Sequence, residues 1–288
     1  MSRTDPERRA RAAPSPAVHP TAIVEDGARL GAGVDVGPYC VVHAGAEIGD
    51  GCRLGPYVHV HARVELGEGC VVGSGSSLGG PPQDVKYAGE PTRVRIGAGC
   101  QLHEGVSVHR ATGQGAETVV GAGVMLMAGA HVGHNCRVGD GVVMVNGSML
   151  GGHAEVGERA LLSGNSAVHQ FCRVGRLTLV GGACMATRDA PPFSIVVGSY
   201  PPRWRAPNTV GLRRAGLGVE TRTAIRRALV AIFRATNARA AAEALAQDPV
   251  AEVAELARFV LDSKRGVCHG PPAAEAREDS APEPSLPR

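Results

Sequence analysis

Aliphatic residues recur at every sixth position along most of this chain of 288 residues. One run extends over residues 18–78 without a missed step, and the same phase resumes at residue 96 and again over residues 120–180. A small residue, usually alanine, valine or cysteine, stands four positions after most of these aliphatic residues. Glycine often follows the aliphatic residue directly, as in "LGAGVD" and "IGDGCR". The repeat therefore sends the same kinds of side chain in the same direction once every six residues.

A repeat of six fits neither common secondary structure, because a helix needs apolar spacing near 3.6 and an ordinary strand needs spacing of 2. It describes one flat side of a triangular coil, with one large and one small residue pointing inward and glycine relieving the bend at the corner. Three units, about 18 residues, complete a turn. The sequence therefore predicts an all-β parallel β-helix, whereas a β-sandwich would need turn signals every 8 to 12 residues.

The repeat and its interruptions divide the chain. Residues 15–208 are predicted to form the β-helix, interrupted by two polar loops, 79–95 and 110–119, that are rich in glycine or proline. Residues 209–266 change to an Ala-, Leu- and Arg-rich pattern with a break near Asp248, which predicts a small helical domain. Long loops on a rigid solenoid are favoured places for function.

Composition narrows the function classes. The terminal segments 1–14 and 267–288 are polar and rich in proline and charge, and we expect both to be disordered tails. No apolar run approaches the ~20 residues of a membrane span, and the first residues lack the apolar middle of a secretory signal. We therefore expect a cytoplasmic protein. The formal charge of +3 is too weak to favour a nucleic-acid partner.

The eight cysteines do not suggest a disulfide framework. Seven of them occupy the small apolar position of the repeat: Cys40, Cys52, Cys70, Cys100, Cys136, Cys172 and Cys184. We predict buried free thiols that pack as small apolar groups.

Histidines gather at one corner of the predicted coil. Counting by turns of 18 residues places four of them in a strip about three coils tall, at roughly 4.8 Å per coil. They are His131, His134, His153 and His169. None occupies the inward aliphatic phase, so all four should point outward. Imidazoles from adjacent coils could converge on zinc, but Lys86 in the first loop and His109 at the root of the second favour a catalytic site without metal.

Several segments resemble one enzyme family. "QDVKYAGEPTRV", "SVHRAT", "AHVGHNC" and "AVHQFCRVG" occur in order in a chain that, from residue 16 to 216, resembles the UDP-N-acetylglucosamine O-acyltransferases of lipid A biosynthesis. The resemblance implies a left-handed β-helix of hexapeptide repeats and a homotrimer. It also implies transfer of an (R)-3-hydroxyacyl chain from acyl carrier protein to the 3-hydroxyl of UDP-N-acetylglucosamine, without cofactor, metal or covalent intermediate.

The same resemblance implies residue roles. His134 matches the general base, and a neutral imidazole suits that task at neutral pH. Gly152 matches the residue whose backbone N–H stabilises the oxyanion. Gly182 matches the position that limits acyl length, and its missing side chain predicts a long chain. Positions matching substrate contacts are Gln83, Asp84, Lys86, His109, His131, His153, Gln170, Asn208 and Arg214.

Four positions depart from the family pattern. Asn135 stands where an aspartate commonly follows the base, which weakens carboxylate support for His134. Val210 replaces an acidic nucleotide contact, Ala215 replaces the second of two arginines, and Tyr200 stands where a histidine is common.

The start of the helical region is strongly basic. Nine arginines and one acid lie between residues 203 and 239, which suits an acidic carrier protein, although such arginines can also form an ordinary solvated face. In a homotrimer, we expect Lys86 in the first loop of one subunit to lie beside the histidine strip of a neighbouring subunit.

Other functions remain open from the residues alone. The related N-acyltransferase would carry a separate N-terminal domain, for which repeats beginning at Val18 leave no room. An acetyl-CoA-dependent acetyltransferase is disfavoured by "QDVKYAGEPT". A γ-type carbonic anhydrase would bind zinc through histidines, and a purely structural β-helix would need no imidazole strip.

Overall fold

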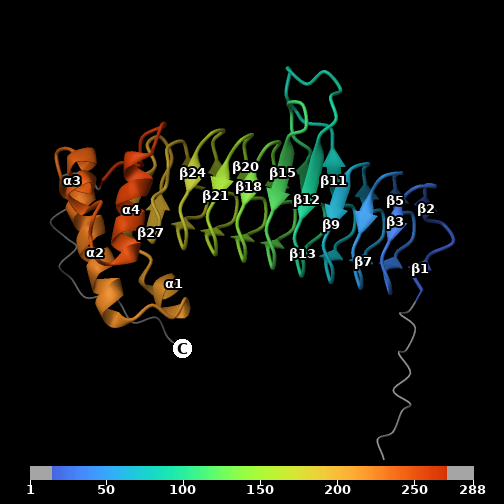
Figure 1. Ribbon diagram of the computed structural model, residues 1–288, viewed down its shortest axis with the longest axis horizontal. Helices are drawn as coiled ribbons and strands as arrows, with labels where there is room; N and C mark the ends of the chain where they lie inside the picture. Colours follow the sequence, from blue (N-terminus) through green and yellow to red (C-terminus); the bar gives the residue numbers. More distant parts are fainter. Residues whose placement is uncertain (1–14, 271–288) are drawn as a thin grey trace, which may run out of the picture.

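The computed structural model describes residues 15–270, and these form a left-handed parallel β-helix with helices at its C-terminal end (Figure 1). Three sheets run along the prism, and each coil contributes one strand to each sheet. The six-residue repeat therefore has the predicted structural meaning.

Most strands contain only two residues, because each side of the prism is short. Sheet A contains β1 (Ala17–Val18), β4 (Asp35–Val36), β7 (Arg53–Leu54), β10 (Val71–Val72), β13 (Gln101–Leu102), β16 (Met125–Leu126), β19 (Val143–Met144), β22 (Leu161–Leu162), β25 (Leu179–Val180), β27 (Ser194–Val197) and β28 (Arg203–Pro207). Sheet B contains β2 (Ile23–Val24), β5 (Val41–Val42), β8 (His59–Val60), β11 (Ser77–Gly80), β14 (Ser107–His109), β17 (His131–Val132), β20 (Met149–Leu150), β23 (Ala167–Val168) and β26 (Met185–Ala186). Sheet C contains β3 (Arg29–Leu30), β6 (Glu47–Ile48), β9 (Val64–Leu66), β12 (Arg93–Ile96), β15 (Glu117–Val120), β18 (Arg137–Val138), β21 (Glu155–Val156) and β24 (Arg173–Val174).

The core is the inside of the prism. The second residue of each short strand points inward, and Val36, Leu54 and Leu126 are almost completely buried. The small residue of each repeat fills the adjacent corner, and the seven cysteines of the repeat are buried and free, as predicted. Cys268, which the sequence placed in a tail, is buried and free as well. Parallel pairing stacks identical positions of successive coils directly on one another.

The corner between sheets B and C carries both long insertions (Figure 1). The first loop covers residues 81–92 and the second covers residues 110–116. Both are shorter than the sequence suggested, because β12 and β15 each extend over four residues with alternate side chains, such as Val94 and Val120, in the core. The sequence places these residues in loops because the arginine and glutamate side chains at the outward positions give the strand ends a polar composition that resembles a loop.

Four helices close the C-terminal end: α1 (Thr209–Arg214), α2 (Val219–Arg234), α3 (Ala238–Leu245) and α4 (Ala251–Leu261). They follow β27 and β28, which pair antiparallel. The ring of Trp204 stacks on that of Phe233 at a centroid distance of 4.9 Å, and Arg176 donates to the carboxylate of Glu255 on α4. No helix among residues 15–270 is both long and apolar enough to span a membrane.

The chain remains ordered past residue 266. Val267 forms a β-bridge with Asp189, His269 forms one with Arg203, and the side chain of Cys268 is only 2% exposed. The expected start of the C-terminal tail at residue 267 is therefore too early. The expected tails at 1–14 and 271–288 lie outside the described residues.

Candidate active site

His134 lies at the corner between β17 and β18, and its protonation pattern follows from its neighbour. Nδ1 of His134 lies 2.9 Å from Oδ1 of Asn135. The backbone of Thr112 fixes the orientation of that amide, because its N–H donates to Oδ1 and its carbonyl accepts from Nδ2, each at 2.9 Å. An amide oxygen only accepts, so Nδ1 of His134 carries the proton and Nε2 presents a lone pair.

Gly152 stacks on His134 one coil further along. A Cβ at Gly152 would lie 2.5 Å from Cε1 of the imidazole and closer still to Nε2. No acceptor for the N–H of Gly152 is found within residues 15–270. At the same corner position of an earlier coil, the N–H of Ala44 donates to a carboxylate oxygen of Glu25 at 2.9 Å. The N–H at this corner can therefore bind an oxygen anion.

A second pair of histidines lies beside this corner. The rings of His109 and His131 meet edge to face at 4.9 Å, and Nδ1 of His131 lies 2.8 Å from the hydroxyl of Ser107. Burial lowers the pKa of His131 to about 4 and also lowers the pKa of His109. Nδ1 of His109 is buried and has no hydrogen-bond partner among the described residues. A buried polar atom of this kind is suited to a ligand's polar group.

His153 links the corner to the first loop. Its ring lies edge-on to His134 at 5.2 Å and stacks on Phe171 at 4.6 Å. The pKa of His153 is lowered, first by burial and then by the charge of His134; Asp84 opposes this shift and Lys86 adds to it. Asp84 and Lys86 are therefore within electrostatic range of His153 in the same chain.

His169 does not join these rings. Its Nδ1 lies 3.1 Å from the carbonyl oxygen of Gln170 and 3.3 Å from the guanidinium of Arg265 near the C-terminal end. The strip predicted from coil counting therefore consists of two ring pairs, His109 with His131 and His134 with His153. His169 contacts Gln170 and Arg265 instead. Gln170 occupies the predicted coil, with its side chain exposed.

The two loops are tied together and to the base. Glu90 accepts from the N–H of Gly113 at 2.6 Å and from the hydroxyl of Thr112 at 3.5 Å. Arg110 donates to the hydroxyl of Tyr87 at 3.0 Å. The chain of contacts from Glu90 through Thr112 and Asn135 ends at His134. Sequence reasoning did not single out Glu90, Thr112 or Arg110, although "YAGEPT" and "HRAT" contain them.

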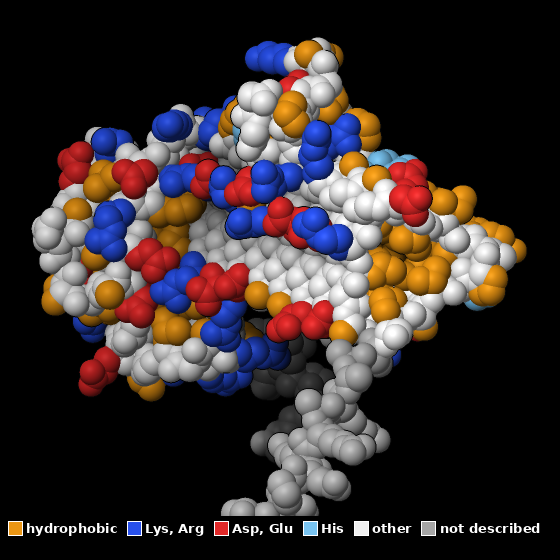
Figure 2. Space-filling view, turned by 45° about the vertical axis from the view of Figure 1, so that its right-hand side comes forward, with side chains coloured by type: hydrophobic (Ala, Val, Ile, Leu, Met, Phe, Trp, Pro, Cys, Tyr) orange, Lys and Arg blue, Asp and Glu red, His pale blue; other side chains and the backbone are white. Residues whose placement is uncertain are grey.

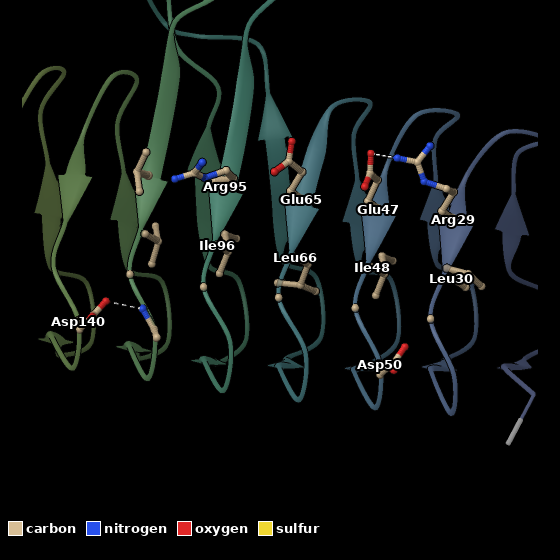
Figure 3. Close-up of a pocket in the computed structure, with 18 residues that line it drawn as sticks. Arg29, Leu30, Glu47, Ile48, Asp50, Glu65, Leu66, Arg95, Ile96 and Asp140 are labelled. Carbon is tan, nitrogen blue, oxygen red and sulfur yellow. Dashed lines mark hydrogen bonds and ion pairs between the residues drawn. The ribbon is translucent and has the colours of Figure 1, made fainter. Parts of the chain in front are cut away.

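Among the hollows on the surface of residues 15–270, one of two described next borders the site. A cavity of about 420 Å³ is lined by Asn135, His153, Glu155 and the second loop. A larger groove of about 830 Å³ runs along sheet C and contains neither histidine nor cysteine (Figure 3).

The charges of the larger groove are already matched. Figure 2 shows rows of alternating positive and negative side chains across one face of the molecule. Arg29 pairs with Glu47 in the groove, and Asp140 accepts from the N–H of Ala122 at 2.8 Å (Figure 3). The smaller cavity, which His153 and the Asn135 partner of His134 line, is therefore the better candidate for the chemistry.

The remaining predicted residues lie apart from the rings. Asn208 caps α1 by accepting from the N–H of Gly211 and donates to the carbonyl of Leu177, so both ends of its amide are engaged. Arg214 ends α1 with an exposed side chain, and Gln83 is exposed on the first loop. At Gly182 a Cβ would meet only the carbonyl oxygen of Gly164, at 3.6 Å, so the space beside it is open.

Of the four departures from the family pattern, only Asn135 contacts the rings. The side chain of Tyr200 is 75% exposed and that of Val210 is 48% exposed. Ala215 ends α1 as its C-cap residue.

Known proteins share this architecture and sequence. Residues 189–268 match the family described as UDP-N-acetylglucosamine O-acyltransferase, domain 2, and residues 45–80 and 117–152 match bacterial transferase hexapeptide repeats. The acyl-[acyl-carrier-protein]–UDP-N-acetylglucosamine O-acyltransferase of Syntrophobacter fumaroxidans is 39% identical over 254 residues, covering 87% of this chain and 98% of the relative. The enzyme of that name from a Synechocystis strain is 41% identical over 160 residues, 56% of this chain, and the match spans 58% of that relative's length.

Solved structures agree with these matches. The UDP-N-acetylglucosamine acyltransferase of Bacteroides fragilis superimposes with a TM-score of 0.84 at 29% identity, over 88% of this chain and 100% of its own. The Arabidopsis UDP-N-acetylglucosamine acyltransferase gives a TM-score of 0.78 at 31% identity, over 87% and 99%. This chain therefore belongs to the UDP-N-acetylglucosamine O-acyltransferase family.

Proposed function

We propose that this chain transfers an (R)-3-hydroxyacyl group from acyl carrier protein to the 3-hydroxyl of UDP-N-acetylglucosamine, the first step of lipid A biosynthesis. The relatives at 39% and 41% identity carry acyl carrier protein and UDP-N-acetylglucosamine in their names. The observation that carries the proposal is a single one: the fixed hydrogen bond from Nδ1 of His134 to Asn135 leaves Nε2 as a free base at an outward corner. Neither an acetyltransferase nor a carbonic anhydrase has comparable support.

In the proposed reaction, Nε2 of His134 removes the proton of the sugar's 3-hydroxyl as that oxygen attacks the thioester carbonyl. The carbonyl oxygen becomes an oxyanion and accepts a hydrogen bond from the N–H of Gly152. When the tetrahedral intermediate collapses, the carbon–sulfur bond breaks and the leaving thiolate takes the proton from the imidazolium. A base of this kind contributes roughly 10²- to 10⁴-fold to the rate.

Substrate contacts follow from position around that base. His109, with its unpartnered Nδ1, and His131 would bind the sugar, while Asp84 and Lys86 would reach the sugar and phosphates beside His153. Gln83 and Gln170 would complete this surface. Asn208 and Arg214 lie by α1, about two coils or roughly 10 Å along the axis from the base, where they border the path to nucleotide or pantetheine groups.

The acyl chain would run past Gly182. The open space beside this glycine favours a long 3-hydroxyacyl group, since no side chain blocks the groove. The carrier protein would dock on the arginine-rich region of residues 203–239, most of whose arginine side chains are exposed. An acidic protein would be attracted to this region at low salt.

A homotrimer is the assembly we propose. The side chain of Val85 at the tip of the first loop is fully exposed in the single chain, which suits burial against a neighbouring subunit. We also propose a cytoplasmic location, since eight free buried thiols fit a reducing compartment.

The test is acyl transfer from a panel of 3-hydroxyacyl carrier proteins to UDP-N-acetylglucosamine by the wild type and by His134→Ala. We expect transfer by the wild type and a loss of about 100-fold or more in the variant. His103→Ala is the matched control, because His103 is exposed on another side of the prism. Transfer to no acceptor would refute the function, whereas an active His134→Ala would refute only the assigned base.

A further inference from the structure

Three histidines outside the candidate active site converge at the N-terminal end of sheet B. His43 follows β5, His59 lies in β8, and His61 follows β8. One nitrogen from each of the three rings lies within 4.8 Å of the others. His43 and His59 approach to 2.7 Å between their Nε2 atoms, and the rings of His59 and His61 stack at a centroid distance of 4.0 Å.

The coil geometry produces this convergence. Val41 of β5 pairs with His59 of β8, so His43, one place after β5, stacks on His61, one place after β8. All three side chains point outward and are half-buried. The residues that follow at the corner, Ala44 and Ala62, are small and leave the rings accessible.

Glu25 adds a second layer to the cluster. One carboxylate oxygen lies 2.9 Å from Nδ1 of His43, and the other accepts from the N–H of Ala44 at 2.9 Å. Since the carboxylate accepts a hydrogen bond from the Nδ1–H group of His43, Nε2 of the same ring presents its lone pair toward the other two rings. A carboxylate bound to the far nitrogen of a histidine is the usual outer partner of a metal-binding imidazole.

We propose that His43, His59 and His61 bind one divalent transition-metal ion of the zinc class, with Glu25 orienting His43. Zinc bonds of about 2.0–2.1 Å hold tetrahedral imidazole nitrogens roughly 3.3 Å apart. The contact between His43 and His59 must open by about 0.6 Å for this, which small ring rotations achieve. Three protein ligands leave a fourth position for water or another ligand.

The cluster adjoins the proposed catalytic rings but shares no residue with them. Gly80 lies between them: a Cβ there would be 3.8 Å from Nε2 of His61 and 3.7 Å from the ring of His109.

The family resemblance implies no metal, and the histidine strip that the sequence predicts lies on later coils. His43 and His59 are 16 residues apart in the sequence. Only the stacking of one coil on the next brings them together.

The experiment uses the full chain without a polyhistidine tag, freed of metal and dialysed. Bound Zn²⁺ is measured by elemental analysis after re-addition, and Co²⁺ is titrated as a spectroscopic probe, since a tetrahedral Co²⁺ ion absorbs visible light far more strongly than an octahedral one. We expect about one ion per chain. His59→Ala and His61→Ala should weaken binding more than tenfold, Glu25→Gln roughly 10- to 100-fold, and His103→Ala not at all.

Thermal unfolding provides a second readout, because an ion bound only to the folded state raises its melting temperature. Zn²⁺ should raise the melting temperature of the wild type but not of His59→Ala, and the metal-free proteins should melt alike. Well under one ion per chain in the wild type, or full binding by both histidine variants, would overturn the proposal. Loss of the ion in His131→Ala with retention in His59→Ala would overturn it too, by placing the metal in the catalytic strip.

Discussion

The imidazole of His134 lies directly against the backbone of Gly152, so close that even one methyl group on Gly152 would occupy the space of Nε2. The glycine therefore does two things at once in the proposed site: it leaves room for the base, and it offers a free N–H beside it. Its backbone does not need glycine, because its φ angle is not in the left-handed region.

Gly152→Ala should reduce kcat by about 100-fold or more. The new methyl group displaces His134 and occupies space that the thioester oxygen needs to approach the backbone N–H of residue 152. The melting temperature should change little, since the corner faces outward. His103→Ala again serves as the control, because its side chain is exposed on another side of the prism. An active Gly152→Ala enzyme would contradict the assignment.

Asn135→Asp and Asn135→Ala should behave differently. The aspartate retains an oxygen that accepts from Nδ1 of His134, so we expect kcat within about tenfold of the wild type. The alanine removes that acceptor and both bonds to Thr112, and should cost about 100-fold in kcat. Steady-state kinetics of both variants, with circular dichroism to verify folding, test the point. Equal losses would mean that loop anchoring, not tautomer control, is what Asn135 provides.

Glu90 should control the order of the second loop. Its pKa is lowered, chiefly by the N–H groups of Gly113 and Ala88, so the folded loop favours the charged form. The charged carboxylate of Glu90 therefore protects the loop at pH values above the ordinary glutamate pKa of about 4.3. This protection is lost as the pH falls through the lowered pKa of the folded protein. Protection factors of residues 110–116, which remove the intrinsic pH dependence of amide hydrogen exchange, should therefore fall on acidification, so that exchange becomes fast relative to the intrinsic rate. In Glu90→Gln it should be fast already at pH 7, and an unchanged exchange rate there would refute the coupling.

Acid should destabilise the fold through its buried imidazoles. The unfolded chain takes up a proton on His131 near pH 6.5, whereas the folded protein resists until about pH 4. The unfolded state binds more protons in this window, so the free energy of unfolding falls as pH drops from 6.5 toward 4. Urea unfolding midpoints measured across that range should fall less steeply in His131→Asn than in the wild type. Parallel curves would show that His131 does not contribute.

The six-residue period by itself determined the β-helix, the inward aliphatic residues and the buried thiols. The reason is local: each hexapeptide is one side of the prism, and the positions of Leu54 or Cys52 in their repeat fix which way they face. The same counting placed His134 and Gly152 on one corner, because both lie two residues after an inward aliphatic residue.

Tertiary structure alone decided which side chains touch. Thr112 meets Asn135 because an inserted loop folds back on the next coil, and no period describes an insertion. Asn208 engages Leu177 and caps α1, a contact across 31 residues. His43 and His59 meet because coils stack with parallel register. The sequence repeat sets the direction of each side chain, whereas contacts depend on the distance between coils and on the path of the loops, which only the folded chain defines.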